Sequence, residues 1–162
     1  MFKALYCALV RSNLEYCTVA WKPFTGVQIE KIESVQKQFL LVALRSLGWN
    51  HPFMLPRYED RLRLLTMIPL NDRRTIFDAV FMYKLMNDEI DVPNLRNSIL
   101  ENGSTYATRF RSRLIYDSHS TSYGMNEPIT RMIRLYNSHR DIFENCNSIN
   151  TFKSKIRIEV CG

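Results

Sequence analysis

Arginines at regular spacing are the residues of this chain whose arrangement could support a specific chemistry, which is contact with phosphate groups. Arg109, Arg111 and Arg113 occupy alternate positions, so a strand would place all three on one side. Arg131 and Arg134 would share a helix face at i, i+3. Such cations can follow a phosphate backbone without contacting base edges.

The remaining candidate nucleic-acid-binding residues are Lys37, Arg45 and Arg73. The ordinary alternative for any single cation is a solvated face with local Arg–carboxylate pairs, such as Arg74 with Asp78. No acid interrupts Arg109–Arg113. Both interpretations of that row therefore stay open.

The sequence contains none of the usual catalytic patterns. It has no Gly-rich phosphate loop, no G-x-S-x-G, no His-x-x-x-His and no adjacent Asp-Asp pair. The seven Asp residues are scattered (60, 72, 78, 88, 91, 117 and 141). We therefore predict no catalytic residue, no metal site and no cofactor, and a chain that is not an enzyme on its own.

The cysteines and the hydropathy pattern bear on location. Cys7, Cys17, Cys146 and Cys161 form no C-x-x-C pair, and no histidine lies near them. This excludes a zinc site and favours reduced thiols in an intracellular, non-secreted protein. No stretch approaches the ~20 apolar residues of a membrane span, so we expect no membrane partner.

The composition is that of a folded, moderately basic domain. Apolar residues make up 46% of the 162 positions, and the formal net charge is +6. This fraction is sufficient for a hydrophobic core. The positive charge favours an anionic partner such as nucleic acid, although it could also serve only solubility.

The chain is organised around a central amphipathic helix, predicted over Val27–Leu47 and capped by Thr25-x-x-Gln28. Its apolar stripe is Gln28, Ile32, Val35, Phe39, Ala43 and Leu47, and its polar side is Ser34, Lys37, Gln38 and Arg45. We expect a surface ion pair between Glu33 and Lys37. The outlying Leu41 is either an ordinary single exposed leucine or a contact with another chain or domain. A first helix over Phe2–Trp21 has two apolar sides, which predicts packing between other helices.

Four further segments have helical patterns. They are Tyr58–Met67, Leu70–Asn87, Pro128–Phe143 and a last helix capped by Ser148, with Phe152 and Ile156 in its core face. In Leu70–Asn87 the expected stripe is Leu70, Phe77, Val80, Phe81 and Leu85, and the polar positions are Asp72, Arg73, Arg74 and Asp78. Asn94–Leu100 has room for one or two helical turns.

The patterns together predict an all-α fold, a bundle of about five to six helices. They allow a short β-hairpin near residues 109–124, where the sequence alternates and Tyr116–Gly124 could form the return strand. We expect a helical pair over 1–50 and a C-terminal helical extension over 51–162 that packs on it, as one continuous domain.

Two segments in this order resemble the C-terminal part of the reverse transcriptase of insect non-LTR retrotransposons, of the jockey-like and related kinds. They are LYCALVRSNLEYCTVAWKPF and IEKIESVQKQFL. The similarity continues through Tyr58, Arg61, Arg73, Arg74, Asp78 and Leu85, and then through Tyr123–Gly124, Asn126, Pro128 and Arg131–Met132. The family often has Asn-Gly where this chain has Asn87-Asp88, a departure that affects only the turn.

The resemblance implies the thumb and the helical segment after it, without the fingers and palm that carry the catalytic carboxylates. The chain's start inside the first expected helix would fit such a fragment. Its partners would be RNA or an RNA–DNA duplex, and the missing fingers and palm. The alternatives are a protein-interaction or self-association module and an inert remnant of the element.

Overall fold

The computed structural model describes residues 2–49, 56–101, 114, 116 and 119–162. These residues form helices and connecting segments with no strand among them, which confirms the predicted all-α fold. They pack as two compact units. Unit 1 comprises Met1–Thr18 and Pro23–Arg74, and unit 2 comprises Val19–Lys22 and Thr75–Gly162. The predicted boundary at residue 50 stays a prediction, because this division concerns packing alone.

The first helix of unit 1 is shorter than the predicted Phe2–Trp21. It consists of α1 (Phe2–Leu5), a π-helical turn η1 (Tyr6–Arg11) and α2 (Ser12–Glu15). The helix ends because Tyr16 is extended, with ψ of 129°, and Cys17 is left-handed, with φ of 53°. The predicted C-terminal end at Trp21 was therefore wrong.

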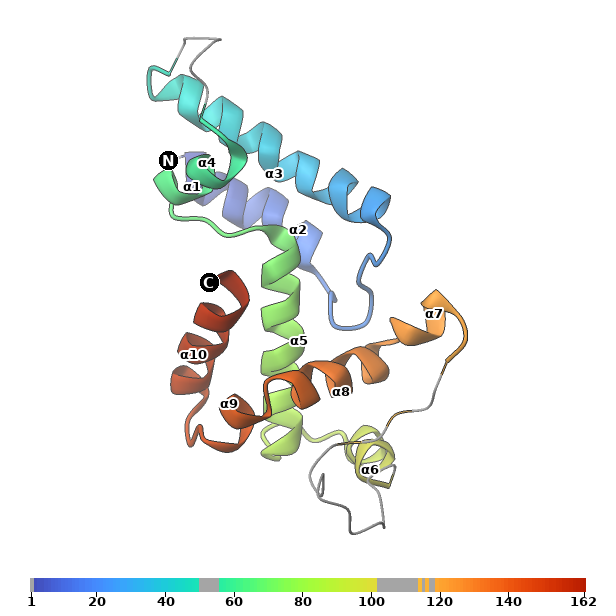
Figure 1. The fold of residues 1–162 in the computed structure, drawn as a ribbon. Helices are drawn as coiled ribbons and strands as arrows, with labels where there is room; N and C mark the ends of the chain where they lie inside the picture. The colour runs from blue at the N-terminus through green and yellow to red at the C-terminus, as the bar shows by residue number, and fades with distance from the viewer. Residues whose placement is uncertain (1, 50–55, 102–113, 115, 117–118) are drawn as a thin grey trace. The chain divides into compact units, whose positions relative to one another are not determined.

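The longest helix, α3 (Gly26–Ser46), lies alongside the first helix in Figure 1. Thr25 caps it as predicted, since its hydroxyl oxygen accepts a hydrogen bond from the Gln28 backbone N–H at 3.4 Å. The predicted core face was wrong for most of its length. The buried residues are Glu33, Gln36, Leu40, Ala43 and Leu44, whereas Val35 and Leu47 are exposed. The sequence does contain the predicted apolar stripe, but the segments around α3 pack on the adjacent face of the helix.

The core of unit 1 is small. It contains Tyr6, Leu40, Leu62 and Met67, and the Tyr6 and Phe39 rings stack with centroids 4.1 Å apart. Besides the first helix and α3, it uses α4 (Tyr58–Leu64) and the residues just after that helix. The start of α5 (Leu70–Met86) also belongs to unit 1.

Unit 2 contains the rest of α5 and five further helices. They are α6 (Pro93–Glu101), α7 (Ser122–Met125), α8 (Pro128–Ser138), α9 (Arg140–Glu144) and α10 (Ile149–Cys161). Helix α6 confirms the expected helical turns, and Pro128 stands in the first turn of α8 as predicted. The single helix predicted over Pro128–Phe143 is wrong, because His139, with φ of −121°, interrupts it.

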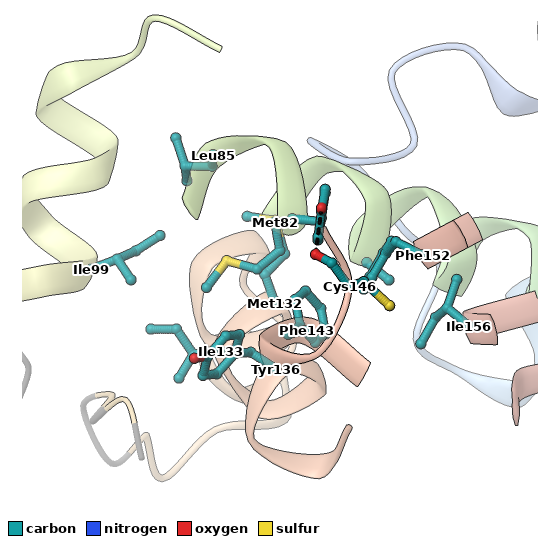
Figure 2. Packing of buried hydrophobic residues seen from close by; sticks show 12 residues of the cluster. Met82, Leu85, Ile99, Met132, Ile133, Tyr136, Phe143, Cys146, Phe152 and Ile156 are labelled. Atoms are coloured by element: carbon teal, nitrogen blue, oxygen red, sulfur yellow. Dashed lines mark hydrogen bonds between the residues drawn. The ribbon is translucent and has the colours of Figure 1, made fainter. Parts of the chain in front are cut away.

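The core of unit 2 is larger and confirms the predicted core face of the last helix. Phe152 and Ile156 are fully buried, and Ser148 caps α10 by accepting from the Thr151 N–H at 3.3 Å. Figure 2 shows Phe152 and Phe143 among side chains of α5 and α8. The centroids of their rings lie 4.8 Å apart.

The hairpin allowed near residues 109–124 is only partly covered by the described residues. Before the return strand, which would begin at Tyr116, only Leu114 is among them. The end of its return strand is wrong, because Ser122–Gly124 belong to α7. Thr121 starts that helix by accepting a hydrogen bond from the Gly124 N–H at 3.1 Å, which favours helical over extended backbone there.

Candidate functional site

A buried carboxylate of unit 2, Asp78, has a side chain that is 1% exposed. One carboxylate oxygen accepts from Arg131 Nε at 2.9 Å and from Lys22 Nζ at 3.2 Å. The other accepts from an Arg131 terminal nitrogen at 3.1 Å. Arg131 also donates to the Val19 carbonyl at 2.8 Å and to the Asn126 carbonyl at 3.0 Å. This Asp78 cluster joins residues 19–22, α5 and α8.

Unit 1 also contains a buried acid, Glu33 on α3. Both of its carboxyl oxygens accept from the Leu70 backbone N–H at 3.1 Å, and one also accepts from the Tyr58 hydroxyl. Leu70 is the first residue of α5, so its N–H has no partner within the helix. Glu33 therefore caps α5 from a helix distant in sequence, where a negative charge also complements the helix dipole.

The Glu33 contact extends into a connected polar network. The fully buried Gln36 amide donates to Tyr58 Oη at 3.2 Å and to the Ile68 carbonyl at 3.0 Å. Its oxygen accepts from the Tyr6 hydroxyl at 3.2 Å. We call these four side chains, Tyr6, Gln36, Tyr58 and Glu33, the Glu33 network. Their mutual hydrogen bonds offset the cost of burying them.

Two buried tyrosines, Tyr6 and Tyr58, lead us to expect that unit 1 loses stability at alkaline pH. Burial raises the pKa of Tyr6 to about 12. Burial and the hydrogen bond to Glu33 raise the pKa of Tyr58 as well. The folded state thus favours the protonated phenols. Their contribution to the stability of unit 1 is complete below ~10, the pKa of a tyrosine in the unfolded chain, and is lost as the pH rises from there through the pKa values of the folded chain.

This is tested by following phenolate absorbance against pH for the folded and the urea-unfolded chain. We expect late-titrating tyrosines in the folded chain only, and one fewer in a Tyr6→Phe variant. Identical titrations of the folded and unfolded chains would contradict the prediction.

The predicted nucleic-acid-binding cations lie in different environments. Lys37 pairs with Glu30 at 2.6 Å, not with Glu33 as predicted, because Glu33 is buried. Arg73 forms a two-point contact with Glu15, whose second hydrogen bond is 2.9 Å long. Arg45 and Arg134 are exposed. Arg109, Arg111 and Arg113 lie outside the described residues. Whether any of these residues binds nucleic acid stays a prediction.

Arg74, for which a solvated helix face was the ordinary alternative, is instead buried. Arg74 is 1% exposed and donates to the Leu14 carbonyl at 3.0 Å. Asp78 is also 1% exposed, so neither residue stays on a polar helix surface as predicted.

Helix α10 carries cations that the candidate set omitted. Lys153, Lys155 and Arg157 are all exposed, with Lys153 and Arg157 at i, i+4 on one face. Among the described residues, no carboxylate lies within ion-pair distance of these three cations, of Arg45 or of Arg134. Their clustering near the end of the sequence could have marked them as candidate nucleic-acid-binding residues.

An apolar groove of about 300 Å³ lies on unit 1 between the first helix and α3. It is lined by Phe2, Leu5, Tyr6, Leu9 and Val10 from the first helix and by Val35 and Phe39 from α3. Phe2 is 51% exposed and Leu9 64% exposed. Only Tyr6 of these first-helix residues is buried, whereas Leu5, Leu9 and Val10 are exposed. The first helix is therefore not packed between other helices along this groove, as its two apolar sides had predicted.

Other classes of site are not found in the described part of the chain. His, Cys, Asp and Glu residues do not gather there in groups of three or more that could hold a metal ion. Within the same residues, every helix is too short or too polar to cross a membrane.

Comparison of the chain with protein-family models, with curated proteins and with solved structures returned no match.

Proposed function

We propose that this chain is a non-catalytic, thumb-like part of a non-LTR retrotransposon reverse transcriptase that binds a template–primer duplex through phosphate contacts. The order of the sequence motifs supports the family. The observation that supports binding is the exposed set of cations with no described carboxylate partner: Arg45, Arg134, Lys153, Lys155 and Arg157. Cations of this kind are free to contact phosphates.

The acidic residues of the sequence motifs are already bonded to other groups of the chain. Glu15 pairs with Arg73, Asp78 with Arg131, and Glu33 caps α5. These acids are therefore engaged inside the units and cannot neutralise the exposed cations. Exposed cations of this kind bind nucleic acid by charge, so the affinity falls as salt rises.

The test is binding of the purified chain to an RNA–DNA hybrid duplex at low and at physiological salt. We expect affinity to fall steeply with salt. Replacing Arg109, Arg111 and Arg113 together by Ala should reduce the slope of log K against log salt by about 3, since each phosphate contact contributes about 0.9. The same change at Lys153, Lys155 and Arg157 tests the α10 cations.

The matched control is Lys153→Arg with Lys155→Arg, which keeps both charges and should keep the binding. A folded chain that fails to bind the duplex at low salt would contradict the proposal. Extension of a primer by the purified chain would contradict its non-catalytic part.

The second candidate function is a protein-interaction module. The observation that favours it is the apolar groove, whose lining side chains include the exposed Phe2, Leu5 and Leu9. Exposed apolar patches rimmed by polar residues mark contact surfaces.

A further inference from the structure

We infer that the apolar groove of unit 1 is a docking site for an acidic amphipathic helix of another protein. The inference rests on the interaction-module candidate and does not require nucleic-acid binding. It follows from the exposed side chains of the groove and from two cations on the same face of α3.

The groove exposes more apolar surface than ordinary packing requires. Phe2, Leu5 and Leu9 stand at i, i+3 and i+7 on the first helix and are 51%, 48% and 64% exposed. With Val10, Val35 and Val42, their exposed fractions correspond to roughly 600 Å² of surface, the upper end for the largest patch on a monomer. A typical interface buries about 800 Å² on each partner, so this patch is large enough to be its apolar centre.

The patch continues along α3 as a stripe with the spacing of a helix face. Val35 and Val42 are seven residues apart and are 39% and 55% exposed. Lys31 precedes Val35 by four positions and Arg45 follows Val42 by three, so both cations lie on this face. In ideal helix geometry the two cations are about 21 Å apart along the axis.

The two cations are available to a partner. Both are exposed, and no carboxylate of the described residues lies within ion-pair distance of either. The neighbouring Lys37 differs, because Glu30 neutralises it at 2.6 Å. A positive charge at each end of the apolar stripe complements a ligand with carboxylates at both ends of its own apolar stripe.

A second copy of the chain fits this surface less well. An antiparallel pair of α3 helices centred between Val35 and Val42 would bring Lys31 of one copy beside Arg45 of the other. Like charges placed together at an interface cost affinity. A helix with apolar residues at i, i+3 or i+4 and i+7, flanked by Glu or Asp about 14 positions apart, meets both the groove and the charges.

The experiment uses the full chain and a fluorescent synthetic helix of about 22 residues, with Leu at those positions and a Glu pair at each end of the stripe. We expect saturable binding by fluorescence anisotropy. Leu9→Glu and Val35→Glu should each weaken it about tenfold or more, because a buried carboxylate then faces the apolar ligand. Ile158→Glu, at a 72% exposed position of α10, is the matched control and should bind normally.

Charge reversal tests the proposed orientation. A chain with Lys31→Glu and Arg45→Glu should bind the Glu peptide about tenfold more weakly and should bind a Lys-for-Glu peptide better than the unchanged chain does. The five altered positions, Leu9, Lys31, Val35, Arg45 and Ile158, are all exposed, so circular dichroism should show an unchanged fold.

Equal binding of the Glu and Lys peptides, or no binding of the Glu peptide, would overturn the inference. So would self-association that Leu9→Glu abolishes in a chain that binds no peptide, because the occupant would then be a second copy. Duplex binding by the Leu9→Glu variant tests the thumb-like proposal separately, since that variant keeps every cation.

Discussion

Replacing Asp78 by alanine should lower the free energy of unfolding by about 3–5 kcal/mol, with the loss concentrated in unit 2. The substitution removes the acceptor for Arg131 and Lys22, whose side chains are 12% and 13% exposed. Both cations would remain largely buried without their carboxylate. Breaking a buried pair from one side is costly for this reason, even where the intact pair adds little net stability.

Two further variants distinguish the effect of losing the charge from the effect of losing the side-chain volume and geometry. Asp78→Asn keeps the volume and one acceptor oxygen, so we expect a smaller loss than for alanine. Arg131→Lys keeps the charge but loses the two-point contact with Asp78, and should also be destabilising.

The measurements are urea unfolding and hydrogen exchange followed by peptide. Asp91→Ala, at an exposed aspartate, is the matched control, and its effect should stay within about 0.5 kcal/mol. An Asp78→Ala chain as stable as this control would show that Arg131 and Lys22 find other partners or water.

The local signals of the sequence predicted the helices well. Thr25, Ser148 and Pro128 mark helix starts as expected, because capping depends on residues within one turn. The core face of α10 was also predicted, since Phe152 and Ile156 are its large apolar residues at i, i+4. The all-α class follows from these local features, the helix caps and the apolar helix faces.

Periodicity failed where a buried residue is polar. It places Glu33 and Arg74 on the surface, because pattern analysis assigns polar side chains to solvent, yet both are buried. Their burial depends on partners elsewhere in the chain, such as the first N–H of α5 for Glu33. It also placed Val35 in the core, whereas the structure leaves it beside the apolar groove.

The candidate cations show the same limit. Arg131 and Arg134 look equivalent in the sequence, yet Arg131 is held by Asp78, 53 residues away, and Arg134 is exposed. Arg73 is likewise held by Glu15, 58 residues away. A cation's availability depends on tertiary neighbours, so spacing alone could nominate these residues but could not rank them.

The second large effect is expected from Glu33→Ala, which should cost about 3 kcal/mol or more and loosen unit 1. It removes the acceptor of the Leu70 N–H and of the Tyr58 hydroxyl, and a buried group left without its partner costs about 1–3 kcal/mol. It also removes the negative charge at the start of α5. The effect should therefore appear as faster hydrogen exchange in the first turn of α5 and in α4.

The size of the effect should depend on what replaces the carboxylate. Glu33→Gln retains one acceptor oxygen for the Leu70 N–H, so we expect about 1–2 kcal/mol, less than for alanine. Glu30→Ala on the same helix is the matched control, because its side chain is 64% exposed and pairs only with Lys37 in the described contacts. Such exposed pairs contribute about 0–1 kcal/mol. If Glu33→Ala and Glu30→Ala were equally mild, the cap from α3 would contribute little, and α5 would begin at Leu70 through its own sequence.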